Sequence, residues 1–139
     1  MAVLALFPGS FDPFTRGHEA ILRRVLPLFD KVVVAVGVNS EKKYMFSVEE
    51  RVARIREMMK DCPNVEVTSY EGMTIDLCHQ LGAKVIIRGI RTTKDFEYEQ
   101  TVAAVNRLQD PSIETLLLMA DPEHVDISST LERERLSHK

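Results

Sequence analysis

The sequence predicts an α/β fold in which helices cover both faces of a parallel sheet. Short apolar runs rich in β-branched residues alternate along the chain with stretches whose apolar residues recur at helical spacing. The runs are almost continuously apolar, as in residues 32–38, which is typical of parallel strands buried on both faces. Glycine-rich or polar clusters follow several runs, at the edge where such sheets bind ligands. Together these features predict a Rossmann-like sheet of five parallel strands.

The first half of the chain is expected to form a strand, a helix, a strand and a second helix. Residues 3–7 are an apolar run, and the helical pattern after them reaches Pro27. Proline lacks an N–H and clashes with the preceding turn, so the first helix should end or kink there. Residues 32–38 form the second strand. Ser47 and Glu50 have the spacing of a capping box, which opens the second helix.

The second half continues the alternation to the end of the chain. Strands are expected at residues 65–69, 84–88 and 113–119, and helices at residues 74–81, at 95–108 and from Ser129, where Glu132 completes a second capping box. We find no internal repeat, low-complexity tract or linker, so residues 1–139 are expected to form a single domain. A chain of this length can bury about two thirds of its unfolded surface without disulfides or metals.

Composition argues against several classes of function. A net charge of −3 predicts no broad positive surface, so no nucleic acid is expected as a partner. The apolar start of the chain lacks a basic leading region and is much shorter than the roughly 20 residues that cross a bilayer, so no membrane association is expected. Cys62 and Cys78 have no disulfide or zinc-ligand spacing, which favours a reducing cytoplasm.

Residues 9–18, with the sequence G-S-F-D-P-F-T-R-G-H, carry the clearest functional signal because they join the first strand to the first helix. They match neither G-x-G-x-x-G nor the P-loop pattern. Ser10 and Thr15 offer hydroxyls, and His18 lies at a helix start, where the dipole favours a phosphate. An isolated histidine there would cap its own backbone. In this context His18 is instead the first catalytic candidate, as a donor to charge that develops in phosphoryl or nucleotidyl transfer.

Two basic clusters follow later strands of the same predicted edge. Lys42 is either a solvated surface charge or a phosphate ligand, and only its position after the second strand favours the second interpretation. Arg88 and Arg91 lie on either side of Gly89 and Ile90 and present two guanidiniums suited to bidentate phosphate contact, and the glycine is expected to leave room for the phosphate. A salt bridge from these arginines to an acidic residue among 95–99 is the structural alternative, and both could hold.

Taken together, these motifs resemble the phosphopantetheine adenylyltransferase family, within the T/H-x-G-H nucleotidyltransferase superfamily. The resemblance covers essentially the whole chain. It rests on G-S-F-D-P and T-R-G-H at residues 9–18, K-K and M-F at 42–46, E-E-R at 49–51, N-V-E-V at 64–67, R-G-I-R at 88–91, D-F-E-Y-E at 95–99, Asn106 and I-S-S-T at 127–130.

The resemblance implies a reaction and a set of site residues. The phosphate of 4'-phosphopantetheine would attack the α-phosphorus of ATP and expel pyrophosphate, with Mg²⁺ assisting and no protein metal ligand assigned. His18, stabilising the transition state, Lys42 and Arg91 would be catalytic, and Ser10, Lys42, Thr74 and Arg88 would contact phosphopantetheine. ATP would contact Ser10, Phe11, His18, Gly89, Ile90, Arg91, Glu99, His124, Val125, Asp126, Ile127, Ser128, Ser129 and Thr130. A homohexamer and feedback inhibition by coenzyme A are further expectations from the family.

Three other functions are weighed against this one. Nicotinate-mononucleotide adenylyltransferases share G-x-F-D-P and I-S-S-T, but R-G-I-R followed by D-F-E-Y-E favours the phosphopantetheine family. Cytidylyltransferases usually carry R-T-x-G-I-S-T-T, which is absent from this chain. A noncatalytic nucleotide- or coenzyme A-binding module would be free to lose His18, which is present. The main departure from the family is the C-terminal segment, expected to be shorter than usual because the chain stops at Lys139.

Overall fold

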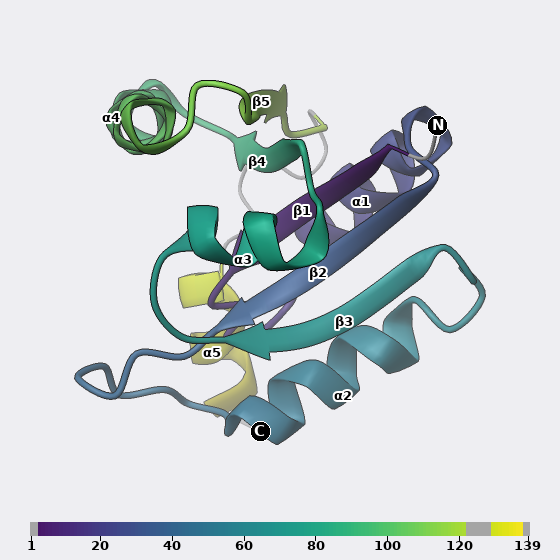
Figure 1. The fold of residues 1–139 in the computed structure, drawn as a ribbon. Coiled ribbons are helices and arrows are strands. Elements are labelled where there is room, and N and C mark those ends of the chain that lie inside the picture. Colours follow the sequence, from purple (N-terminus) through teal and green to yellow (C-terminus); the bar gives the residue numbers. More distant parts are fainter. Residues whose placement is uncertain (1–2, 122–128, 138–139) are drawn as a thin grey trace.

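The computed structural model describes residues 3–121 and 129–137, and in this part of the chain five parallel strands form one sheet (Figure 1). The strand order is β3-β2-β1-β4-β5. The strands are β1 (Leu4–Gly9), β2 (Lys31–Gly37), β3 (Val65–Tyr70), β4 (Val85–Ile90) and β5 (Glu114–Met119). The helices are α1 (Arg16–Val25), the short 3₁₀ helix η1 (Leu26–Leu28), α2 (Val48–Met58), α3 (Thr74–Leu81), α4 (Thr93–Gln109) and α5 (Ser129–Ser137). The predicted Rossmann-like fold is confirmed.

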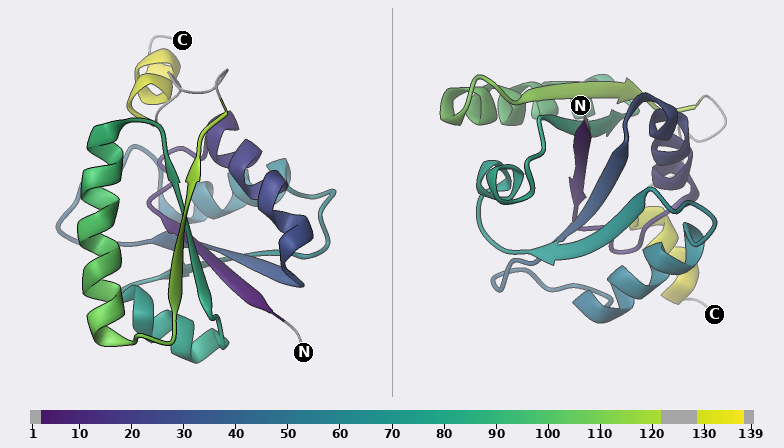
Figure 2. Two further views of the ribbon diagram at one scale, coloured as in Figure 1. Left: turned by 90° about the horizontal axis from the view of Figure 1, so that it is seen from above. Right: turned by 45° about the vertical axis from the view of Figure 1, so that its right-hand side comes forward.

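Alternate residues of the central strands pack into two separate cores. Val32 and Val34 face α1 and α2, whereas Val33 and Ala35 face α3. Figure 2 shows the same layers, with α1 and α2 on one side of the sheet and α3 and α4 on the other. Because successive side chains of a strand point to opposite faces, a continuous apolar run is what a sheet covered on both sides requires.

The expected elements are present, with small differences at their ends. Pro27 lies in η1, directly after α1, as its missing N–H predicts. The Ser47 hydroxyl accepts from the Glu50 N–H and the Glu50 carboxylate accepts from the Ser47 N–H, which confirms the capping box of α2. Helix α4 begins before residue 95 because the Thr92 hydroxyl accepts from the Asp95 N–H at 3.1 Å and caps it.

The sheet opens between β1 and β4 at the carboxyl ends of the strands. Strand β1 pairs with β2 from Leu4 to Gly9, but with β4 only at Ala5 and Leu6. Beyond Leu6 the two strands separate, and this is also where the chain order reverses in the sheet. Such a switch point is the usual ligand site of an open parallel sheet. Within the described residues, no helix is long and apolar enough to span a bilayer.

Candidate active site

Two cavities lie side by side at this opening. The first has a volume of about 340 Å³ and lies against α1, and the second has a volume of about 300 Å³ and lies towards the β2–α2 loop. Both cavities are lined by Pro8, Gly9, Ser10, Arg88 and Tyr98. The shared residues mean that molecules bound in the two cavities would meet at Ser10 and Arg88.

The β1–α1 loop forms the wall of the first cavity through local packing. Phe11 has a positive φ of 49°, and its buried ring lies over Gly9. A Cβ atom on Gly9 would come within 2.9 Å of that ring, so the close approach requires glycine. The Phe11 ring also meets the rings of Phe7 and Phe14 at centroid distances of 5.3 and 5.4 Å. These contacts give the loop a packed aromatic base.

His18 both caps α1 and faces the first cavity. Its Nδ1 accepts from the Thr15 N–H at 2.9 Å, and its own N–H donates to the Thr15 hydroxyl at 3.3 Å. The imidazole stacks on Phe14 at 5.4 Å and meets the edge of Phe11 at 5.0 Å. Because a backbone N–H can only donate, Nδ1 must be unprotonated, and in the neutral ring the proton is on Nε2.

The charge of His18 is set by its surroundings. Burial, together with the nearby positive charges of Arg88 and Arg91, lowers the pKa of His18 from 6.5 to about 4. The imidazole is therefore neutral at physiological pH, with one ring nitrogen engaged by the backbone and the other available as a donor. The capping interpretation is therefore confirmed, and it leaves the second ring nitrogen for the predicted role as a donor.

The two arginines of β4 and its following loop are held by carboxylates of α4. Arg88 donates from Nε and Nη2 to both oxygens of Glu99 at 2.8 and 2.7 Å, and from Nη1 to the Pro8 carbonyl at 2.5 Å. Burial lowers the pKa of Arg88, but the hydrogen bonds and charge of Glu99 outweigh it and raise the pKa overall. Arg91 pairs with Asp95 at 3.4 Å. The salt-bridge alternative is thus present, while both arginines still line the first cavity.

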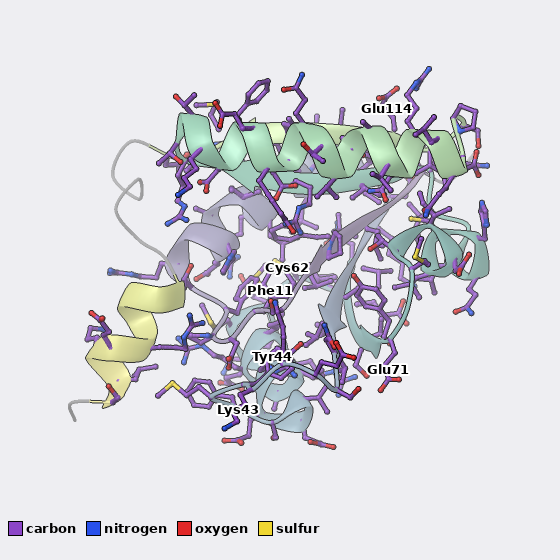
Figure 3. All side chains as sticks on the ribbon, turned by 90° about the vertical axis from the view of Figure 1, so that its left-hand side faces the viewer. Phe11, Lys43, Tyr44, Cys62, Glu71 and Glu114 are labelled. Atoms are coloured by element: carbon purple, nitrogen blue, oxygen red, sulfur yellow. The ribbon has the colours of Figure 1, made fainter. Side chains whose placement is uncertain are left out.

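The second cavity combines three segments that are distant in the sequence. Lys42 comes from the β2–α2 loop, Thr74 from the start of α3 and Asn106 from α4. The Tyr70 and Thr74 hydroxyls lie 3.1 Å apart. Lys42 lines the cavity, whereas Lys43 does not appear among the residues around it. Figure 3 shows Lys43 and Tyr44 on this loop, with Phe11 further inside the molecule.

Most of the predicted site residues come together here, with some differences in role. Ser10, Phe11, His18, Arg88, Gly89, Arg91 and Glu99 line the first cavity, and Ser10, Lys42, Thr74 and Arg88 line the second. Ile90 is buried and lines neither. The predicted residues His124, Val125, Asp126, Ile127 and Ser128 lie outside the described residues. Ser129 and Thr130 open α5, but their side chains are also outside the description.

Gly89 lines the first cavity and also meets a packing requirement that the sequence did not indicate. The sequence predicts that this glycine leaves room for a phosphate. A Cβ at this position would also meet the Ile21 Cδ1 atom of α1 at 2.3 Å. The missing side chain therefore allows α1 to pack closely on β4, which is a structural requirement of the helix that carries His18.

Sequence reasoning assigned no role to several residues around the second cavity. Tyr98, Val102 and Asn106 of α4 all line it. Their spacing of four residues places them on one face of a helix, so the pattern could have identified them once α4 was known to flank the site. Tyr70, at the end of β3, carried no comparable signal.

The fold and this site together define a nucleotidyltransferase of the Rossmann-like type. The family model described as cytidylyltransferase-like matches residues 6–135. A phosphopantetheine adenylyltransferase of Flavobacterium psychrophilum is 52% identical over 94% of this chain and 85% of its own length. Another, from Bacteroides fragilis, is 48% identical over 96% of this chain and 89% of its own length. The chain belongs to the phosphopantetheine adenylyltransferase family.

Solved structures support the fold independently of close sequence similarity. The crystal structure of a bifunctional NMN adenylyltransferase/ADP ribose pyrophosphatase from Francisella tularensis aligns with a TM-score of 0.75. The alignment covers 99% of this chain and 43% of that one, at 17% identity. At this identity the likeness concerns the fold alone.

Proposed function

We propose that this protein transfers AMP from ATP to 4'-phosphopantetheine, giving dephospho-coenzyme A and pyrophosphate in coenzyme A biosynthesis. The observation that carries the proposal is the pair of cavities that meet at Ser10 and Arg88 beside the neutral His18. A reaction that joins two substrates through a phosphate needs such a meeting point. The curated relatives at about half identity are named for this reaction.

In the proposed reaction an oxygen of the phosphopantetheine phosphate attacks the α-phosphorus of ATP. The new P–O bond forms as the bond to the leaving pyrophosphate breaks, and the electron pair of that bond stays on pyrophosphate. The nucleophile is already anionic, so the protein needs no general base. Its task is to align the two phosphates and to stabilise charge on the nonbridging oxygens.

The side chains divide this task between the two cavities. ATP occupies the first cavity, where the Nε2–H of His18 is a fixed neutral donor and Arg91 a charged one. Phosphopantetheine occupies the second, with Thr74 and Lys42 on its walls. Arg88, shared by both, lies where the nucleophilic phosphate approaches. Because its guanidinium is already fixed by Glu99, little reorganisation is needed during the reaction.

Mg²⁺ is proposed to enter as part of the ATP substrate. The described residues offer no cluster of three or more histidine, cysteine or carboxylate groups suited to a metal. The carboxylates that line the first cavity, Asp95 and Glu99, are paired with Arg91 and Arg88. These residues do not fit a resident metal site.

Assembly, regulation and compartment are further parts of the proposal. Phe96 and Leu108 of α4 and Met119 of β5 are 42, 86 and 63% exposed, and apolar surface of this kind supports association with copies of the chain, as a homohexamer. Coenzyme A contains both an adenylate and a phosphopantetheine group, so it would occupy both cavities and act as a feedback inhibitor. Cys62 and Cys78 are free thiols, which suits the cytoplasm.

Pyrophosphate release tests the reaction. The chain is incubated with ATP, Mg²⁺ and either 4'-phosphopantetheine or nicotinate mononucleotide, and release is expected with the first acceptor alone. Release with nicotinate mononucleotide alone would assign the protein to the other adenylyltransferase. If neither acceptor gives release while ATP or coenzyme A still binds, the noncatalytic binding function replaces the proposal.

A further inference from the structure

Arg51 of α2 is a buried cation outside both cavities. The residue is 2% exposed. Nε donates to the Phe46 carbonyl at 3.2 Å, and Nη1 donates to the carbonyls of Ser10 and Gly37 at 2.8 and 3.0 Å. The guanidinium also lies 4.0 Å from the centre of the Tyr44 ring. No aspartate or glutamate among the described residues pairs with it.

A core position alone does not account for this residue. Burying a guanidinium without a carboxylate partner is costly, and it is tolerated only where hydrogen bonds replace the lost hydration. Ile55, one turn further along α2, is fully buried and fills the same core with an apolar side chain. Filling the core therefore does not explain why an arginine occupies position 51.

The three carbonyls belong to the β1–α1 loop, to β2 and to the β2–α2 loop, each of which contributes residues to the second cavity. Ser10 starts the β1–α1 loop, Gly37 ends β2, and Phe46 ends the loop that carries Lys42. Ser10, Gly37 and Lys42 all line this cavity. The planar guanidinium thus connects the β1–α1 loop, the end of β2 and the Lys42 loop, which all border the proposed phosphopantetheine cavity.

The Lys42 loop is anchored at the same point by Asp12 of the β1–α1 loop. The buried Asp12 carboxylate accepts from the Met45 and Phe46 N–H groups, each at 2.9 Å. The backbone of Phe46 is therefore held on its N–H by Asp12 and on its carbonyl by Arg51. Three hydrogen bonds within the loop add to these anchors, each at 3.0 Å: the Lys42 N–H donates to the Asn39 carbonyl, the Asn39 N–H donates to the Tyr44 hydroxyl, and the Glu41 N–H donates to the Asn39 side-chain oxygen.

We propose that Arg51 is a positioning residue for adenylyl transfer, holding the Lys42 loop against Ser10 in the geometry that the reaction requires. The inference rests on the proposed function and adds to it a residue that touches neither substrate. Arg51 acts through the Lys42 loop. Small displacements of such groups are costly, since about 1 Å can lower a rate by about 100-fold.

The test compares Arg51→Met with Arg56→Met in pyrophosphate release from ATP and 4'-phosphopantetheine. Arg56 serves as the control because it is an exposed arginine of the same helix that donates to one backbone carbonyl, that of Val67, away from both cavities. We expect Arg51→Met to lower kcat by about 10- to 100-fold, with the Kd for ATP changed less than about threefold. Arg56→Met should retain kcat. Arg51→Lys keeps the positive charge but loses the planar guanidinium, so its kcat should lie between those of Arg51→Met and Arg56→Met.

A double-mutant cycle with Lys42→Ala separates positioning from general damage to the fold. If Arg51 acts through the Lys42 loop, Arg51→Met should lower kcat by less than about threefold once Lys42 is absent. An equal loss in both backgrounds would overturn the proposal, as would an Arg51→Met enzyme as active as Arg56→Met. If Arg51→Met fails to fold by circular dichroism, Arg51→Lys takes its place in the same cycle. A wild-type chain without pyrophosphate release would overturn the proposed function, and this inference with it.

Discussion

The two walls of the site are built in different ways. His18 is fixed by neighbours in its own loop: Thr15 engages its backbone and Nδ1, and Phe11 and Phe14 hold its ring. Lys42 is on an exposed loop whose anchors, Asp12 and Arg51, come from other elements. The comparison indicates that His18, the proposed catalytic donor, is organised locally, whereas the wall of the second cavity that carries Lys42 depends on tertiary contacts.

His18→Ala should have the largest effect on the locally organised wall. Removing a preorganised donor at developing charge typically lowers kcat by about 100- to 1,000-fold. The change in Tm should be small, because the Thr15 hydroxyl can still cap the helix. Steady-state kinetics and thermal unfolding measure the two effects. The exposed His79 provides a matched control, and unchanged turnover in His18→Ala would remove His18 from the mechanism.

The low pKa of His18 predicts how this wall responds to acid. Between pH 6.5 and about 4 the unfolded chain protonates His18 and the folded chain does not. The stability due to the neutral ring is thus fully present above pH 6.5 and is lost as the pH falls towards 4, by up to roughly 3 kcal/mol. Urea unfolding of wild type and His18→Gln at pH 7 and 4.5 measures it. Wild type should lose more stability than the variant, and equal losses would contradict the assigned pKa.

Arg88→Ala tests the residue that joins the two walls. It removes the guanidinium at the proposed nucleophile and leaves the buried Glu99 carboxylate unpaired. We expect the KM for phosphopantetheine to rise about 10- to 100-fold, the equivalent of one charge-assisted hydrogen bond. The unpaired carboxylate should lower stability by about 1–3 kcal/mol.

Adding Glu99→Gln to Arg88→Ala separates these two effects. The double variant has no unpaired charge, so the free energy of unfolding should recover while the KM stays high. If KM recovered together with stability, Arg88 would act through the fold rather than through contact with the substrate.

The same contrast explains what the sequence could predict. His18 was identifiable because its cap and its loop lie within the G-S-F-D-P-F-T-R-G-H segment. Lys42 could not be separated from Lys43 on local grounds, since the contacts that join their loop to the rest of the molecule come from Asp12 and Arg51. The strands and helices followed from periodicity, because the sheet is covered on both faces. The role of Tyr98 depended on knowing which face of α4 meets the cavity.

Gly89→Ala tests the packing of α1, the helix that carries His18, on β4. It should have the smallest effect on activity. The added methyl would approach the Ile21 Cδ1 atom at 2.3 Å, so either the side chain or helix α1 must shift. Overpacking of this kind costs about 1–3 kcal/mol. Ile21→Val removes the conflicting atom and should restore part of the stability of Gly89→Ala, although alone it costs about 0.5–1.5 kcal/mol.

Gly37→Ala is the matched control for this pair, because a Cβ there has its nearest neighbour at 3.7 Å, an ordinary contact. Unfolding free energies of the single and double variants form a cycle whose coupling should be favourable. If Gly89→Ala is no less stable than Gly37→Ala, but raises the KM for ATP, the glycine serves the ligand after all. A loss of stability that Ile21→Val restores would instead show that the packing of α1 on β4 holds the helix that carries His18 in place.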